Sequence, residues 1–164
     1  MIIEGKNLIE INIPDSARSI GISNDTPWFN AQPYGLIYIG DVAFRWKGEM
    51  EQNAHVSFED GTTIINGGVF GFQGNWSLAS VSIPDSVKII GDRAFGGIKY
   101  LQTIVIPQSV VKVGMGAFRD CGSLTNVIIL NDNIEIDDRA FNGCYSLSEE
   151  SRARILEINP NAVF

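Results

Sequence analysis

The stretch VSIPDSVKIIGDRAF, Val81 to Phe95, is nearly repeated 23 residues further on as IVIPQSVVKVGMGAF, Ile104 to Phe118. The same spacing separates matching residues along the chain, namely Leu78, Leu101, Leu124 and Leu147; Phe95, Phe118 and Phe141; Ile83, Ile106 and Ile129; Gly91 and Gly114; and Pro84 and Pro107. A fixed period of this length is the signature of a solenoid, in which each unit covers the apolar face of the next.

Two less regular copies lie upstream. Val56 to Phe58 aligns with Val81 to Ile83 at an offset of 25 residues, and a partial copy, NLIEINIPDSARSIG, runs from Asn7 to Gly21. We therefore expect one domain over residues 1–164. It divides into a first partial repeat over 1–21, an insertion over 22–55, regular repeats over 56–148 and a C-terminal cap over 149–164.

Each unit contains two short extended segments. Its leucine, valine and isoleucine alternate like a strand with one face inward, and proline ends that strand because it donates no ladder hydrogen bond. A second segment follows, then a glycine corner and an inward phenylalanine. Stacked at about 4.8 Å, the spacing of paired strands, these units predict a mainly β solenoid with internal columns of phenylalanine, leucine and isoleucine.

Composition limits the function classes. An apolar fraction of 45% and a charged fraction of 19% indicate neither a disordered chain nor a membrane-spanning one. The net charge of −7 argues against nucleic acid and anionic membranes as partners, since both need a positive surface. Met1 to Glu4 lacks the basic start of a signal peptide, so both a cytoplasmic protein and one with a removed leader remain open.

The motifs IPDSVKIIGDRAF and AFRDCGSL closely resemble the unit of the BspA-like leucine-rich repeat family, a 23-residue variety found mainly in bacterial surface proteins. The resemblance covers Asn7 to Gly21 and Val56 to Leu147. It implies a right-handed, horseshoe-like leucine-rich repeat solenoid, secreted or displayed on the cell surface. It also implies adhesin-like binding, because some members bind fibronectin, fibrinogen or other host matrix proteins.

The repeat departs from that family pattern at both ends. Leu130 to Asn133 replaces the expected proline and serine-valine segment, Asp137 replaces a glycine, and no alanine-phenylalanine turn follows Gly21. We expect these departures to loosen the ends of the stack.

The insertion carries six of the sixteen aromatic residues, Trp28, Phe29, Tyr34, Tyr38, Phe44 and Trp46. Gly40-Asp41 separates two alternating runs and predicts a β-hairpin. The segment IGDVAF at Ile39 imitates IGDRAF at Ile90, but the residues that follow favour the hairpin over another coil. The aromatic rings form either a local core over the first coil or, in an alternative interpretation, a carbohydrate-binding site of Trp28, Tyr34 and Trp46.

Both ends of a solenoid need covering. Ser146 and Glu149 fit a capping box, which predicts a helix from Glu149 to Ile158 that Asn159-Pro160 terminates. Its apolar residues Ile155, Leu156 and Ile158 should face the stack. Its arginines, Arg152 and Arg154, should face water. Met1 to Ile3 resembles an uncovered edge, to be covered by earlier coils, by the hairpin or by self-association.

Few residues suggest chemistry. His55, the single histidine, is interpreted as a partly exposed strand residue, because no nucleophile motif accompanies it. Cys121 and Cys144 should stack as a reduced, buried ladder, since stacked side chains point the same way. The acidic segment from Asn131 to Asp138 lacks calcium-loop spacing and is interpreted as a solvated turn. Two N-glycosylation patterns begin at Asn24 and Asn75.

One surface is a candidate for binding. The outward positions of the first strand of each coil should form a continuous ribbon of small, mostly neutral residues, namely Glu10, Asn12, Ser80, Ser82, Thr103, Val105, Asn126 and Ile128. Solenoids use such extended faces to bind partners. The sequence thus favours a non-enzymatic protein-binding module without cofactor or metal. A structural spacer or self-assembly unit is the alternative, alongside carbohydrate binding by the hairpin.

Overall fold

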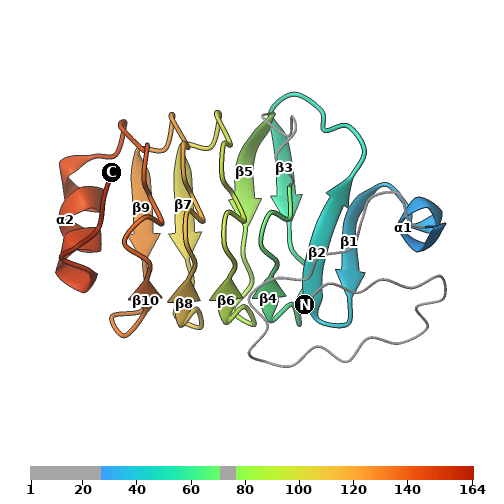
Figure 1. The fold of residues 1–164 in the computed structure, drawn as a ribbon, viewed down its shortest axis with the longest axis horizontal. Coiled ribbons are helices and arrows are strands. Elements are labelled where there is room, and N and C mark those ends of the chain that lie inside the picture. The colour runs from blue at the N-terminus through green and yellow to red at the C-terminus, as the bar shows by residue number, and fades with distance from the viewer. Residues whose placement is uncertain (1–26, 71–76) are drawn as a thin grey trace.

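The computed structural model describes residues 27–70 and 77–164, and their coils stack along the long axis of the molecule (Figure 1). Helix α1 (Pro27–Ala31) lies at one end and helix α2 (Glu149–Ile158) at the other. Between them the strands lie in two rows, with β3, β5, β7 and β9 in one and β4, β6, β8 and β10 in the other. The predicted mainly β solenoid with a C-terminal helix is confirmed.

The longer row is one six-stranded sheet in the order β1-β2-β4-β6-β8-β10. Its strands are β1 (Gly35–Ile39), β2 (Val42–Lys47), β4 (Ile64–Ile65), β6 (Ile89–Ile90), β8 (Lys112–Val113) and β10 (Glu135–Ile136). The predicted hairpin is β1 paired antiparallel with β2, and all later pairs are parallel. Because Val42 and Ala43 pair with Ile64 and Ile65, β2 also occupies the place of a coil strand, in a register four residues away from the one that the IGDVAF imitation implies.

The hairpin builds the local core that its aromatic residues predicted. Phe29 from α1 and Phe44 from β2 are buried there, with Trp28 packed edge-on against Phe44 at 6.1 Å between ring centroids. Ile64 of the neighbouring coil is in the same cluster, so the hairpin joins the stack through this core.

The first partial repeat lies outside the described residues, as do Met1 to Ile3, Asn24 and Asn75.

The other row contains two separate parallel sheets rather than one ribbon. Strand β3 (Ala54–Ser57) pairs with β5 (Leu78–Ser82), and β7 (Thr103–Ile106) pairs with β9 (Asn126–Ile129). No ladder joins β5 to β7 within the described residues, so the outward residues of this row lie on two adjoining sheets and not on one. The break coincides with the coil in which Ile98 occupies the cysteine position, where a branched side chain needs more room than a thiol.

Columns of like side chains fill the interior, as predicted. Phe118 stacks between Phe95 and Phe141, with ring centroids 5.2 and 5.1 Å apart and planes within 4°. Phe70 continues the column at 5.6 Å from Phe95 in a tilted arrangement. These separations are close to the spacing of paired strands, about 4.8 Å, so the ladder sets the distance between rings.

Cys121 and Cys144 are free and fully buried, as the ladder prediction required. Each thiol donates to the phenylalanine carbonyl one coil earlier, Cys121 Sγ to Phe95 O at 3.1 Å and Cys144 Sγ to Phe118 O at 3.0 Å. Hydrogen bonding with Cys144 and then burial raise the pKa of Cys121 well above its ordinary value. The thiols therefore satisfy backbone carbonyls that the stack buries.

The last coil keeps its pairing despite its unusual residues, so the expected loosening at this end was wrong. Asn131 is buried and not a solvated turn residue, because its Nδ2 donates to Val110 O at 2.8 Å and its Oδ1 accepts from Asn133 N at 2.9 Å. Strand β10 pairs with β8, and Asp137 N donates to Val113 O at 3.0 Å. An amide side chain thus replaces the turn that proline and serine make elsewhere.

Helix α2 has the predicted bounds but a different cap. Ser148, not Ser146, is the N-cap, and its Oγ accepts from Ser151 N at 3.2 Å. The Ser146 hydroxyl instead donates to Gly122 O of the previous coil at 2.6 Å, which removes it from the helix. Asn159 ends the helix as expected.

The orientation of α2 was predicted only in part. Ile155 is buried and Ile158 packs against the core, whereas Leu156 is exposed because the helix turns it outward. Arg152 does not simply face water, since it donates to Leu147 O at 3.2 Å and lies 4.9 Å from the Phe164 ring. No helix in the described part of the chain is long and apolar enough to cross a membrane.

We expect Ser148→Ala to lower the free energy of unfolding by about 1 kcal/mol, because a helix N–H group loses its acceptor. Chemical denaturation followed by circular dichroism measures this change. Ser123→Ala, in an ordinary coil turn, is the control and should stay within about 0.5 kcal/mol of the parent. Equal losses in both variants would contradict the role of Ser148 as the cap.

Candidate protein-binding surface

The outward residues of β5, β7 and β9 lie where the sequence predicted, on the solvent side of their strands. Ser80, Ser82, Thr103, Val105, Asn126 and Ile128 are all exposed. Parallel register sets Thr103 beside Asn126 and Val105 beside Ile128. Glu10 and Asn12 lie outside the described residues. We call this outward face of β3, β5, β7 and β9 the strand face.

The strand face also includes two residues of β3 that sequence reasoning did not place there. His55 pairs with Ser80, and Ser57 pairs with Ser82. The 25-residue offset of the upstream copy contained this signal, since it aligns both residues with the serines of the next coil. His55 is exposed on its strand, as expected.

A hydrogen-bonded cluster surrounds the imidazole. His55 Nδ1 lies 2.7 Å from Ser80 Oγ, and His55 Nε2 lies 3.0 Å from Ser57 Oγ and 3.2 Å from Ser82 Oγ. A catalytic triad needs a carboxylate on the second ring nitrogen. Both nitrogens of His55 contact serine hydroxyls instead, so this cluster presents hydrogen-bonding groups at the surface.

The other half of the strand face is more apolar. Val105 is 43% exposed and Ile128 is 46% exposed, side by side on neighbouring strands. Leu130, just beyond the end of β9, adds a third exposed apolar side chain. A polar part over β3 and β5 therefore adjoins a mixed part over β7 and β9.

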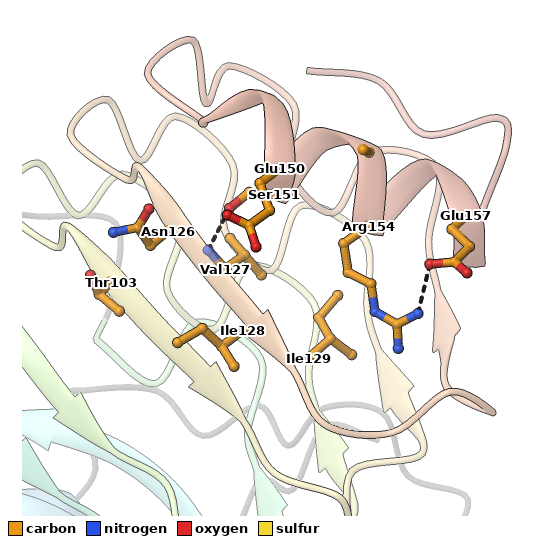
Figure 2. Close-up of a pocket in the computed structure, with 10 residues that line it drawn as sticks. Thr103, Asn126, Val127, Ile128, Ile129, Glu150, Ser151, Arg154 and Glu157 are labelled. Atoms are coloured by element: carbon orange, nitrogen blue, oxygen red, sulfur yellow. Dashed lines mark hydrogen bonds and ion pairs between the residues drawn. The ribbon is translucent and has the colours of Figure 1, made fainter.

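A groove of about 850 Å³ separates the mixed part of the strand face from α2, which runs alongside β9 (Figure 2). Thr103, Asn126 and Ile128 line it from the strands, and Glu150, Arg154 and Glu157 from the helix. Ser151 fixes the helix at this position, because its hydroxyl accepts from Val127 N at 2.9 Å and donates to Thr125 O at 3.2 Å. The sequence held no signal for this groove, because the position of α2 depends on that contact.

Acidic side chains dominate the charge of the groove. Arg154 donates to Glu157 at 2.9 Å and also pairs with Asp132. Hydrogen bonds to Glu157 and then Asp132 raise the pKa of Arg154 above its ordinary value. Glu150 forms no ion pair among the described residues. The lining carboxylates of Glu150 and Glu157 therefore outnumber the lining guanidinium of Arg154, and the groove has a net negative charge.

The three aromatic residues proposed as a carbohydrate site differ in their burial. Trp28 packs in the hairpin core, and Trp46 packs toward the main core at 6.3 Å from the Phe70 ring. Only Tyr34 of the three is largely exposed, at 83%, with Lys47 Nζ 5.4 Å from its ring. The structure thus places the strand-face residues on neighbouring strands, and of these three rings only that of Tyr34 is largely exposed.

The described residues contain no group of three or more histidine, cysteine or carboxylate side chains placed to hold a metal ion. What the surface offers is hydroxyl, amide and apolar side chains on a rigid stack, with an acidic groove at its capped end. The parallel stack of coils around buried leucine, isoleucine and phenylalanine side chains makes the molecule a leucine-rich solenoid, a class that binds partners through extended faces.

The family model of the BspA type leucine rich repeat region matches residues 64–163 in six copies, and the chain belongs to this family. Leucine-rich repeats typically mediate interactions between proteins, and the family consists of repeat modules rather than enzymes. No curated protein matches the chain.

Three solved structures are similar to this chain, and the first of them shows the same fold. A leucine rich cell surface protein from Faecalibacterium prausnitzii A2-165 superposes with a TM-score of 0.54 at 18% identity, over 71% of this chain and 37% of that one. The T. pallidum leucine rich repeat protein has a TM-score of 0.41 at 20% identity, over 67% and 73% of the two chains. A Bacteroides ovatus leucine-rich repeat protein has a TM-score of 0.40 at 28% identity, over 57% of this chain and 30% of that one. The chain therefore spans 37% of the length of the F. prausnitzii protein.

Proposed function

We propose that this protein is a non-enzymatic, adhesin-like binding module that a bacterium secretes or displays on its surface. It contacts host matrix proteins or other proteins through the strand face. Family membership supports the protein-binding class. The F. prausnitzii structure, described as a cell surface protein, is consistent with the surface location.

The observation that carries this proposal is the exposure of the strand face on a rigid stack. Val105 and Ile128 expose apolar surface, and Thr103 and Asn126 next to them expose hydrogen-bonding groups. Parallel pairing and the columns beneath hold these side chains in fixed positions. Because the strand face is already rigid, its side chains lose little conformational freedom when a partner binds. This lowers the entropic cost of association.

The test is binding of the purified protein to immobilised fibronectin and fibrinogen. Thr103→Glu combined with Asn126→Arg places two charged side chains on the strand face without changing a buried residue. We expect saturable binding by the parent and at least about a tenfold loss in this variant, because the two long side chains of the resulting ion pair would cover the surface and would have to be desolvated on binding.

The matched control is Lys99→Glu combined with Gln108→Arg, two exposed positions outside the strands. It should bind like the parent, and circular dichroism should show that both variants are folded. Absence of binding by the parent to either matrix protein would overturn the adhesin part of the proposal. Equal binding by both variants would indicate that the contact with the partner lies outside the strand face.

A further inference from the structure

The groove between the strand face and α2 has a chemical character of its own. We propose that it binds an extended segment of a partner protein in which apolar side chains alternate with lysine or arginine. This inference rests on the proposed protein-binding function and names the partner chemistry of one part of the same surface. Size, apolar content, backbone access and charge each support it.

The size of the groove suits a short extended segment. Helix α2 has 10 residues, and a helix rises about 1.5 Å per residue, so the helical wall is about 15 Å long. An extended chain advances about 3.3 Å per residue. The wall therefore spans about five residues of a partner.

Apolar contact comes from the strand wall. Ile128 lines the groove, and Val105 lies beside it on β7. Both side chains are more than two-fifths exposed, and both are held by ladders on rigid strands. Side chains of an extended segment point alternately to opposite sides, so every second one would meet this apolar wall.

Pairing at the edge of β9 is largely prevented, which decides how the segment lies. Ser151 Oγ accepts from Val127 N, and Ser148 N donates to Thr125 O at 2.9 Å. Helix α2 thus already uses the first backbone groups of this edge. We therefore place the partner across the side chains of the groove rather than as an added strand.

Charge selects the remaining side chains. Glu150 and Glu157 line the helical wall, and the single lining guanidinium, Arg154, is shared between Glu157 and Asp132. An added cation can pair with Glu150 without breaking an existing ion pair. An added anion would meet carboxylates on the same wall. The net charge of −7 extends this preference to the approach of the partner.

The experiment measures fluorescence anisotropy with two labelled ten-residue peptides added to the full chain. One peptide alternates valine with lysine, and the other alternates valine with glutamate. We expect saturable binding of the lysine peptide that weakens as salt is added, because exposed charges are screened. Binding of the glutamate peptide should be at least about tenfold weaker.

Two protein variants, each with its own control variant, locate the site. Glu150→Lys should weaken binding of the lysine peptide roughly tenfold, whereas Glu149→Lys, one residue earlier in the same helical turn, should leave it unchanged. Both glutamates are exposed, but only Glu150 lines the groove. Ile128→Asp tests the apolar wall and should abolish the binding, with Val111→Asp, exposed outside β7 and β9, as its control.

Several results would overturn the inference. These are equal binding of both peptides, no binding of the lysine peptide, or equal losses in the Glu149 and Glu150 variants, which would indicate attraction by overall charge. Concentration-dependent dimerisation abolished by Ile128→Asp would identify a second copy as the occupant. If fibronectin binding depends on the strand face while Glu150→Lys leaves it intact, the proposed function stands and this inference alone fails.

Discussion

Phe118→Ala should lower the free energy of unfolding by about 3–5 kcal/mol. The ring is fully buried and stacks between Phe95 and Phe141 at 5.2 and 5.1 Å. Removing it leaves a cavity between two neighbours, and the coils cannot close over that cavity because backbone ladders hold their spacing. The loss therefore combines the missing transfer free energy with an unfilled volume.

Denaturation by guanidinium chloride, followed by circular dichroism, measures this loss. Tyr145→Ala is the control, since Tyr145 belongs to the same part of the stack but is 79% exposed. It should change stability by no more than about 0.5 kcal/mol. A loss below about 1 kcal/mol for Phe118→Ala would show that the column is not the main core of the solenoid.

Gly91→Ala should be the second most damaging of these substitutions. A Cβ at Gly91 would lie 2.6 Å from Gly67 N and 2.9 Å from Ile65 O, both backbone atoms of the preceding coil. Gly91 N also donates to Ile65 O at 2.8 Å, so the coils cannot separate without straining this hydrogen bond. We expect a loss of about 1–3 kcal/mol from overpacking.

Gly122→Ala is the matched control for this substitution. A Cβ at Gly122 would meet no atom within 4 Å. Neither glycine has a positive φ, so the comparison separates steric crowding from backbone conformation. Thermal unfolding should show a clear decrease for Gly91→Ala and almost none for Gly122→Ala. Similar decreases would mean that the contact between coils is not the reason for glycine at this corner.

These two substitutions explain why the period is visible in the sequence. The column requires an aromatic ring at the same place in each coil, and the corner of Gly91 requires the absence of a side chain. The ring requirement recurs from coil to coil, and the glycine requirement recurs at Gly114, where a Cβ would lie 2.8 Å from Asp92 N, whereas the last coil has Asp137 at this position. Repetition of one local environment therefore makes this fold readable from a single chain.

The candidate surface was predictable to a smaller extent. Alternation along each strand identified Ser80, Thr103 and Asn126 as outward positions, and the structure has all three exposed. The same logic, applied to the upstream copy, would have found His55 and Ser57. It could not reveal that the strand face is two sheets, since the break between β5 and β7 depends on packing between coils.

The capped end shows where sequence patterns stop being sufficient. The helix bounds followed from local signals, but two serines two residues apart could each serve as the cap. Ser146 contacts Gly122 O and Ser148 caps the helix, which only the neighbouring coil decides. The direction of Arg154 likewise depends on Asp132, 22 residues earlier in the chain.

The sequence by itself determined the solenoid, the inward columns, the hairpin turn and the existence of the C-terminal helix. These features depend on alternation, turn residues and a period, which are local properties repeated along the chain. Only the tertiary structure decided that β2 joins the solenoid sheet, that the strand face is divided, and that α2 leaves an acidic groove beside β9. Those features depend on contacts between residues in different coils, where side-chain volume and hydrogen-bond partners choose among arrangements that the local pattern permits equally.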